Sequence, residues 1–156
     1  MVFLLAFAGC STLTIGRLNE QVSANLSSVS VVDTDGRAGQ LYSRALRQAL
    51  YVYGQASPAY DLTSSISVSS SSTLSVRGVN STFKKMTMVA NFALTKQRGG
   101  DVLLRDTVTA DATLGTVSSL FGQDQSELHA RDRMAILLAQ RVTQRVQLYF
   151  LENVDN

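Results

Sequence analysis

The sequence predicts an α+β domain: a four-stranded sheet with two helices packed on one face, in the order strand, helix, strand, strand, strand, helix. Two observations predict this fold class. Segments in which apolar and polar residues alternate, as in strands with one buried face, fill the middle of the chain. Apolar residues spaced three and four apart, as on amphipathic helices, mark one segment after the first strand and another at the C-terminal end. Helices that cover one face of a sheet bury both apolar surfaces, so this packing is the economical one.

The composition agrees with one folded domain. The chain has 156 residues, of which 45% are hydrophobic and 17% charged. That is long enough to bury a core of its own and too apolar for a disordered chain. The net charge of +2 is too small to indicate nucleic-acid binding. No run of 18 or more apolar residues predicts a membrane-spanning helix, and a single cysteine excludes an internal disulfide.

An apolar segment precedes that cysteine. Residues 1–9 read MVFLLAFAG, and Cys10 is followed by Ser11. The run is typical of the core of a secretory signal, with small residues beside the cleavage bond. Residues 7–10 resemble the lipobox of bacterial lipoproteins, which implies that Cys10 carries a diacylglycerol and becomes an acylated N-terminus. We expect residues 1–9 to be the remainder of a signal peptide that begins upstream. The alternative is an ordinary first strand with Cys10 as a buried thiol.

The first strand and helix follow a polar segment. Residues 10–25 are expected to be a tether between the lipid anchor and the domain. Residues 26–32 are rich in valine and partly alternate, so they predict the first strand. Thr34 or Asp35 can cap the helix that follows. Gly54 stands where a left-handed C-terminal cap is expected.

Three strands then form a meander. Residues 60–68 alternate, and the serine run behind them is interpreted as the polar end of the same strand. Residues 83–95 place apolar side chains on one face, and residues 102–114 repeat the pattern. Residues 77–81 are expected at the tip of the first hairpin, and residues 97–101, which contain two glycines, at the tip of the second.

The chain closes with a long helix. Residues 115–122 are predicted to be a loop, and Asp124 and Glu127 resemble a capping box. Residues 125–152 then carry an apolar stripe at helical spacing. The single domain is therefore expected to span residues 26–152.

Little in the sequence indicates catalysis. His129 is the single histidine, no set of metal ligands accompanies it, and no Gly-x-Ser-x-Gly element suggests a serine triad. It is interpreted as a solvated residue in the first turn of the last helix. Asp106 and Asp111 fall on opposite faces of their strand and cannot act as a pair. Asp106 stands on the apolar face, either at a strand end or as a partner for Arg105 or Lys85. The sequence predicts a binding or assembly protein with no cofactor and no metal, not an enzyme.

Basic residues gather at one predicted end of the sheet. Arg77, Lys84 and Lys85 flank the first hairpin tip, whereas Arg98 lies in the second. Alternate tips of a meander lie at opposite ends of a sheet, so Arg98 is expected far from the others. A basic, hydroxyl-rich end can hold a phosphorylated sugar through charge-assisted hydrogen bonds. The alternative is that these are solvated residues that discourage pairing between strand edges.

The chain resembles the LptE family of lipopolysaccharide (LPS)-assembly lipoproteins, in its alphaproteobacterial form. The features that carry the resemblance are the lipobox at 7–10, the helix GQLYSRALRQAL at 39–50, the strand YDLTSSISV at 60–68 and the closing segment ELHARDRM at 127–134, which runs on to Leu-Tyr-Phe at 148–150. The order of predicted elements also agrees over residues 26–152.

The resemblance implies partners and a place in the cell. Family members are outer-membrane lipoproteins that face the periplasm, assist the folding of a large LPS-translocating β-barrel, LptD, and plug it. They also bind LPS during its insertion into the outer leaflet. Ser11, where an Asp would resemble an inner-membrane retention signal, agrees with that location. The candidate LPS contacts that the resemblance implies are Arg77, Lys84 and Lys85. Two alternatives are an accessory lipoprotein of an envelope lipid transporter and a pilotin-like lipoprotein that escorts a secretion channel.

Overall fold

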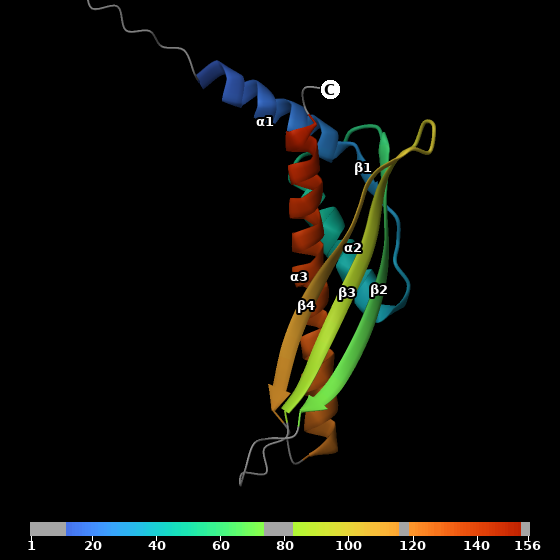
Figure 1. The fold of residues 1–156 in the computed structure, drawn as a ribbon, viewed down its shortest axis with the longest axis vertical. Coiled ribbons are helices and arrows are strands. Elements are labelled where there is room, and N and C mark those ends of the chain that lie inside the picture. The colour runs from blue at the N-terminus through green and yellow to red at the C-terminus, as the bar shows by residue number, and fades with distance from the viewer. Residues whose placement is uncertain (1–11, 74–82, 116–118, 154–156) are drawn as a thin grey trace, which may run out of the picture.

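The computed structural model describes residues 12–73, 83–115 and 119–153 (Figure 1). Three helices and four strands form within them. In chain order they are α1 (Thr12–Ser27), β1 (Val29–Val31), α2 (Gly36–Tyr51), β2 (Tyr60–Thr73), β3 (Phe83–Lys96), β4 (Val102–Gly115) and α3 (Leu120–Glu152). Among these described residues, no helix is both long and apolar enough to cross a bilayer.

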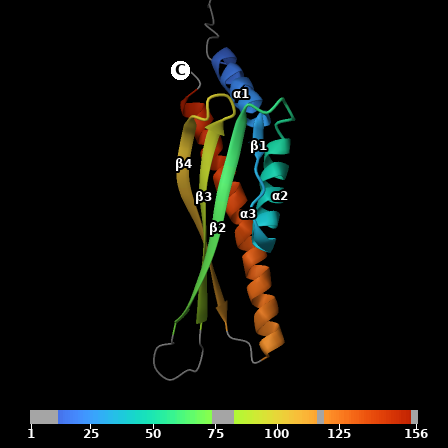
Figure 2. The same cartoon turned by 90° about the vertical axis from the view of Figure 1, so that its right-hand side faces the viewer.

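The strands form one mixed sheet in the order β1-β2-β3-β4. Strand β1 pairs with β2 in parallel, as expected for two strands joined by a crossover helix. Strands β2, β3 and β4 pair antiparallel, each 14 residues long. Helices α2 and α3 lie on one face, and no helix of the described part covers the other face (Figures 1 and 2). The predicted fold class is confirmed.

The core lies between the sheet and these two helices. The predicted inner face of β3 is buried along its whole length, and α3 buries most of its predicted apolar stripe against α2, β4 and β3. Helix α2 adds Tyr42, which is fully buried, and its hydroxyl lies 2.9 Å from the Oγ of Ser64 on β2. Burial raises the pKa of Tyr42 to about 12, so the phenol stays neutral and keeps this hydrogen bond.

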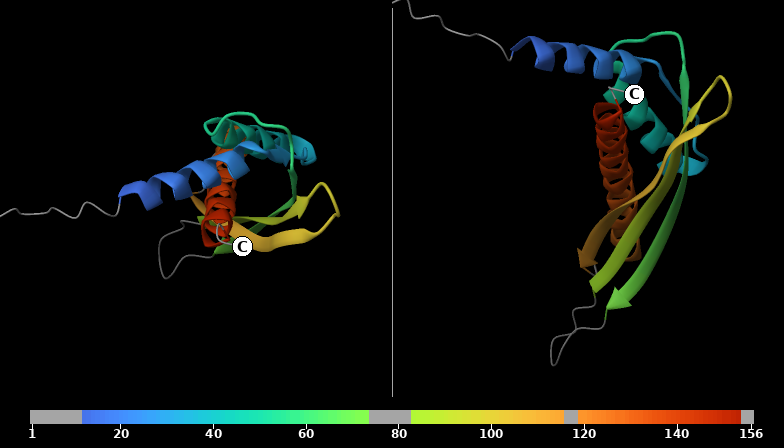
Figure 3. Two further views of the ribbon diagram at one scale, coloured as in Figure 1. Left: turned by 90° about the horizontal axis from the view of Figure 1, so that it is seen from above. Right: turned by 45° about the horizontal axis from the view of Figure 1, so that its top comes forward.

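Helix α1 differs from the expected tether. The polar segment before the domain is helical from Thr12 onward, and its last turns contribute Val22 and Leu26 to the core. Its C-terminal part packs against the end of α3, and its N-terminal part projects beyond the sheet (Figure 3). Ile15, Leu18, Val22 and Leu26 recur at spacings of three and four in the sequence, so a helical period was present, and the expectation of a tether overlooked it. Because α1 extends to Ser27, strand β1 covers only Val29–Val31 of the predicted residues 26–32.

The start of α2 agrees in position with the sequence prediction but differs in its cap. Asp35 occupies the N-cap position, and its side chain makes no capping hydrogen bond. The other proposed cap, Thr34, is buried, and its hydroxyl donates to the carbonyl of Ser64 at 3.4 Å. Gly54 has a φ of +92°, which confirms the left-handed turn predicted after this helix.

The start of α3 needs a correction. The helix begins at Leu120, and the N-cap is Ser119, whose side chain accepts a hydrogen bond from the N–H of Gly122. The predicted capping box of Asp124 and Glu127 is wrong, because both residues lie inside the helix. The side chain of Glu127 instead contacts Lys84 on β3.

Candidate functional site

Lys84 and Lys85, two of the basic residues singled out by the sequence, lie at one end of the sheet, hereafter the basic end. Strand β2 ends here, β3 begins, β4 ends and α3 begins (Figure 1). Lys84 and Lys85 are the second and third residues of β3. Arg77 lies outside the described residues, as does the proposed lipid-attachment residue Cys10. Arg98 lies in the turn at the opposite end of β3, as predicted.

Lys84 and Lys85 point to opposite faces of the sheet, because successive residues of a strand alternate. The Nζ of Lys84 lies 2.7 Å from Oε1 of Glu127, on α3. The Nζ of Lys85 lies 3.4 Å from Oδ2 of Asp111, on the helix-free face. The two ammonium groups therefore do not form one cluster, and each has a carboxylate of its own.

The Lys84–Glu127 pair is largely shielded from water. The exposed fraction is 27% for the Lys84 side chain and 16% for that of Glu127. Glu127 also accepts a hydrogen bond from Nε2 of Gln123 at 3.1 Å, and Nη2 of Arg131 lies 3.9 Å away. The hydrogen bond from Lys84, followed by that from Gln123, lowers the pKa of Glu127. This pair ties α3 to β3 at the basic end.

We expect the contribution of Glu127 to stability to disappear in acid. A carboxyl group whose pKa is lowered by folding stabilises the domain above its ordinary value of 4.5 and loses that effect as the pH falls through the lowered value. Glu127→Gln should therefore cost about 1 kcal/mol at pH 7, and the difference from wild type should shrink in acid. Denaturant unfolding between pH 7 and pH 3 measures it. Asp124→Asn, at an exposed position of the same helix, is the matched control. A difference that stays constant over this pH range would contradict the assignment.

Lys85 is held less tightly than Lys84. Its side chain and that of Asp111 are each 52% exposed. Asp111 accepts a hydrogen bond from Oγ1 of Thr87 at 2.6 Å, and this bond, with Lys85 nearby, lowers the pKa of Asp111. Exposed ion pairs contribute little free energy. Lys85 can therefore exchange Asp111 for an external anion at low cost.

The helix-free face of the sheet is lined with hydroxyl and amide side chains. Strand β2 presents serines at alternate positions, and β3 and β4 present threonines and Asn91. Several bond within the face, as Thr107 Oγ1 does to Oδ1 of Asn91 at 2.7 Å. The sequence predicted this polar alternation. The face is suited to contact with water or with another polar surface.

Large apolar side chains are exposed beside the basic end. Leu120 and Phe121, in the first turn of α3, are 88% and 74% exposed, and Phe83 at the start of β3 is 45% exposed. Sequence reasoning missed the first two because residues 115–122 were expected to form a loop. The adjacent pair Leu-Phe within a polar segment was the signal available. Apolar and cationic groups thus lie at one end of the domain.

The structure gives no catalytic arrangement within its described residues. His129 is exposed on α3, as predicted for a solvated helix residue. No three His, Cys, Asp or Glu side chains of the described part lie close enough together to hold a metal ion. Asp106 pairs with neither Arg105 nor Lys85; its partner is Arg145 of α3, at 3.3 Å.

Comparison with known proteins yields one family and a set of related folds. The family model described as "LptE: Lipopolysaccharide-assembly" matches residues 24–146. A crystal structure of a candidate lipoprotein from Caulobacter crescentus CB15 is similar at 19% identity and a TM-score of 0.64, covering 83% of this chain and 95% of that one. The rare lipoprotein B from Shewanella oneidensis is similar at 16% identity and a TM-score of 0.58, covering 76% and 90%. A minor lipoprotein from Acinetobacter baumannii is similar at 12% identity and a TM-score of 0.54, covering 78% of this chain and 92% of that one. No curated protein matches. At these identities the structures establish a shared fold.

Proposed function

The chain belongs to the LptE lipopolysaccharide-assembly family, and on that premise we infer that it is an outer-membrane lipoprotein, anchored through Cys10, which plugs and helps to assemble the LPS-translocating β-barrel. It binds LPS while the lipid is inserted into the outer leaflet. It does so by binding alone, with no bond made or broken and no cofactor. The observation that carries the proposal is the family match over residues 24–146, which spans all four strands and most of α3.

The helix-free face of the sheet supports a role inside a barrel. The lumen of a large outer-membrane barrel is polar and is often filled by a plug. A surface of short hydroxyl and amide side chains can exchange its hydrogen bonds with water for bonds to such a wall at little cost in desolvation. The faces of α2 and α3 that contact the sheet are occupied by the core. The sheet therefore offers the broad polar surface that a lumen requires.

The basic end supports the contact with LPS. A glycolipid of this class carries phosphate groups next to acyl chains. An ammonium such as that of Lys85 can form charge-assisted hydrogen bonds to phosphate, and burial of exposed apolar side chains such as Phe121 gains about 25 cal/mol per Å² of surface removed from water. Arg77, Lys84 and Lys85 are accordingly the proposed cationic contacts. They would compete with the divalent ions that hold LPS aggregates together.

Co-purification tests the barrel partnership. A C-terminally tagged full chain, isolated from detergent-solubilised envelopes, is expected to bring down an LPS-assembly barrel near one-to-one, as identified by mass spectrometry. An unrelated tagged outer-membrane lipoprotein is the control for non-specific capture. Recovery of a transporter permease or of a secretion channel in its place would overturn the proposal and favour the corresponding alternative.

A further inference from the structure

Side chains form hydrogen bonds with outward-facing main-chain groups at both edges of the sheet. At the edge formed by β4, the carbonyl of Thr109 accepts a hydrogen bond from Arg141 of α3. The N–H of Thr107, on the same edge, donates to Oδ1 of Asp106 at 2.7 Å. Arg145 in turn pairs with Asp106. Charged side chains thus occupy two of the main-chain groups along this edge that could otherwise pair with another strand. This explains why an aspartate stands on the apolar face of β4.

At the edge formed by β1, most outward-facing main-chain groups receive no hydrogen bond from the described residues. The carbonyl of Ser28 accepts from the N–H of Tyr60, and the N–H of Val32 donates to β2. Main-chain groups of alternate residues point to opposite sides of a strand, so those of Val29 and Val31 point away from β2. From the described residues, one hydrogen bond reaches these groups: Nη2 of Arg47 donates to the Val31 carbonyl at 3.5 Å.

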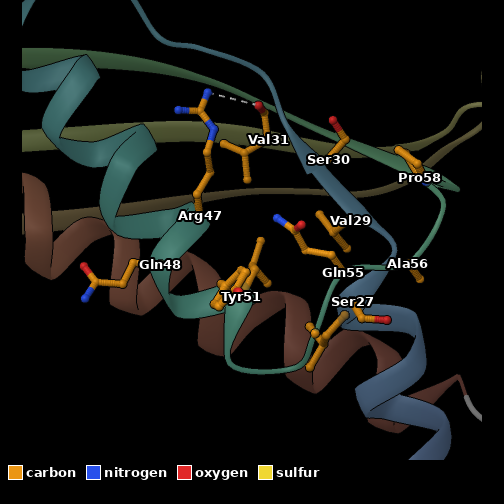
Figure 4. Close-up of a pocket in the computed structure, with 13 residues that line it drawn as sticks. Ser27, Val29, Ser30, Val31, Arg47, Gln48, Tyr51, Gln55, Ala56 and Pro58 are labelled. Carbon is orange, nitrogen blue, oxygen red and sulfur yellow. Dashed lines mark hydrogen bonds between the residues drawn. The ribbon is translucent and has the colours of Figure 1, made fainter.

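These open groups face a groove. The groove has a volume of about 580 Å³ and lies between β1, the C-terminal half of α2 and the segment 54–58 that leads to β2 (Figure 4). Arg47 and Tyr51 of α2 lie along one side of the groove, with Gln48 at its margin, and Gln55 lies between them and β1. The floor is apolar where Leu50 lies. The groove therefore offers hydrogen-bonding main chain along one side and apolar surface below.

We propose that an extended segment of the β-barrel partner's polypeptide binds in this groove and pairs with β1 as a fifth strand. The assignment of the occupant to the barrel rests on the proposed function. Val29 and Val31 present their N–H and C=O groups roughly 6.6 Å apart, the two-residue repeat of an extended polypeptide. An acyl chain has no groups to meet them, and strand addition is a common way for a peptide to bind a sheet edge.

The position of the groove supports this choice of partner. It lies where α1 enters the domain, at the end opposite the basic end (Figures 1 and 2). Since α1 follows Cys10, the proposed lipid-attachment residue, in the sequence, this end would face the inner leaflet and the periplasmic rim of the barrel. Because β1 has only three residues, a partner segment of similar length suffices.

Site-specific crosslinking tests the inference in the full chain in cells. A photoreactive amino acid replaces Gln48 or Gln55 in the groove, and Gln140, exposed on α3, in a parallel strain. We expect crosslinks from both groove positions to the barrel partner. If the barrel co-purifies with the chain but does not crosslink from the groove positions, the inference is wrong and the proposed function stands. A crosslink to a second copy of the chain also overturns the inference. If no barrel co-purifies, the proposed function fails and the inference with it.

A main-chain variant separates strand pairing from mere proximity. Val31→Pro removes the N–H that faces the groove and leaves the hydrogen bonds to β2 in place, since proline is tolerated at a sheet edge. Val31→Ala shortens the same side chain and keeps the N–H. We expect Val31→Pro to reduce crosslinking from Gln48 at least 10-fold, and Val31→Ala to reduce it little. Circular dichroism and an unchanged crosslink from Gln140 show whether the Val31→Pro variant is folded. If the folded variant still crosslinks from Gln48 as wild type does, strand addition is refuted.

Discussion

Substitution of Gly39 by alanine is expected to lower the free energy of unfolding by about 2 kcal/mol. Gly39 is buried in the first turn of α2, and a Cβ there would lie 2.5 Å from the carbonyl oxygen of Thr34 and 2.8 Å from its carbonyl carbon. These are main-chain atoms that cannot rotate away. Thr34 is also held on its other side, because its N–H donates to Oγ of Ser43 at 3.1 Å. The overlap must therefore be relieved by moving the start of α2 away from the main chain of Thr34.

The sign of the effect is decided by two opposing terms. Alanine is favoured over glycine within a helix by about 0.5–1 kcal/mol. Overpacking a rigid contact costs typically 1–3 kcal/mol, and here it sits toward the upper end because both partners are fixed. Gly115→Ala, at the end of β4, is the control for an uncrowded glycine, since no described atom lies within 4 Å of its Cβ, and its effect should stay below about 0.5 kcal/mol. Denaturant unfolding measures both. A Gly39→Ala protein as stable as wild type would show that this contact is not tight in solution.

The long elements could be predicted from the sequence because each repeats its pattern over many residues. The inner side chains of β3, from Met86 to Leu94, alternate without interruption, and every one of them is buried. The stripe of α3 repeats over more than six turns. The period of the apolar residues alone predicts such long elements. In a strand, a shift of one residue would expose the whole apolar set.

The two N-terminal elements were misjudged for different reasons. Strand β1 has three residues, too few to show a period. Helix α1 does carry a helical period from Ile15 to Leu26, but its many polar residues led to the expectation of a tether. What forms them is tertiary: β1 is held by pairing with β2, and Leu26 by packing beneath α2. The start of α3 was misplaced because Asp124 and Glu127 match the spacing of a capping box. Ser119, which caps the helix five residues earlier, has Gly122 at the third position after it and shows no such pattern.

The candidate site could be located from the sequence but not assembled. The meander placed Lys84 and Lys85 at one end and Arg98 at the other, as found. The partners of the two lysines, Glu127 and Asp111, come from elements 43 and 26 residues away along the chain. No spacing rule connects such residues, so the difference between a shielded cation and an available one appears only in the fold.

The two lysines are expected to contribute unequally to LPS binding, because Lys84 is shielded and Lys85 is available. Replacing Arg77, Lys84 and Lys85 together by alanine is expected to weaken LPS binding at least ~10-fold. A hydrogen bond to a charged group contributes about 1.5–3 kcal/mol, so one lost phosphate contact suffices for this change. Among single variants, Lys85→Ala should weaken binding more than Lys84→Ala, because Lys84 is already committed to Glu127. Binding of purified LPS to the purified chain, measured by a fluorescence or calorimetric titration, provides the comparison.

The control must separate a site from a general loss of charge. Lys96, Arg98 and Arg105 lie toward the other end of the sheet, and their joint replacement by alanine removes the same three positive charges. If the basic end is the site, this control binds nearly as wild type, and the difference between the two triple variants diminishes as salt screens the contacts. Equal weakening of both would reduce the role of the basic end to bulk attraction. Unchanged binding in the first variant, with melting showing it folded, would remove these residues from the LPS contact altogether and leave the exposed apolar turn at Leu120 and Phe121 as the part of this end to test next.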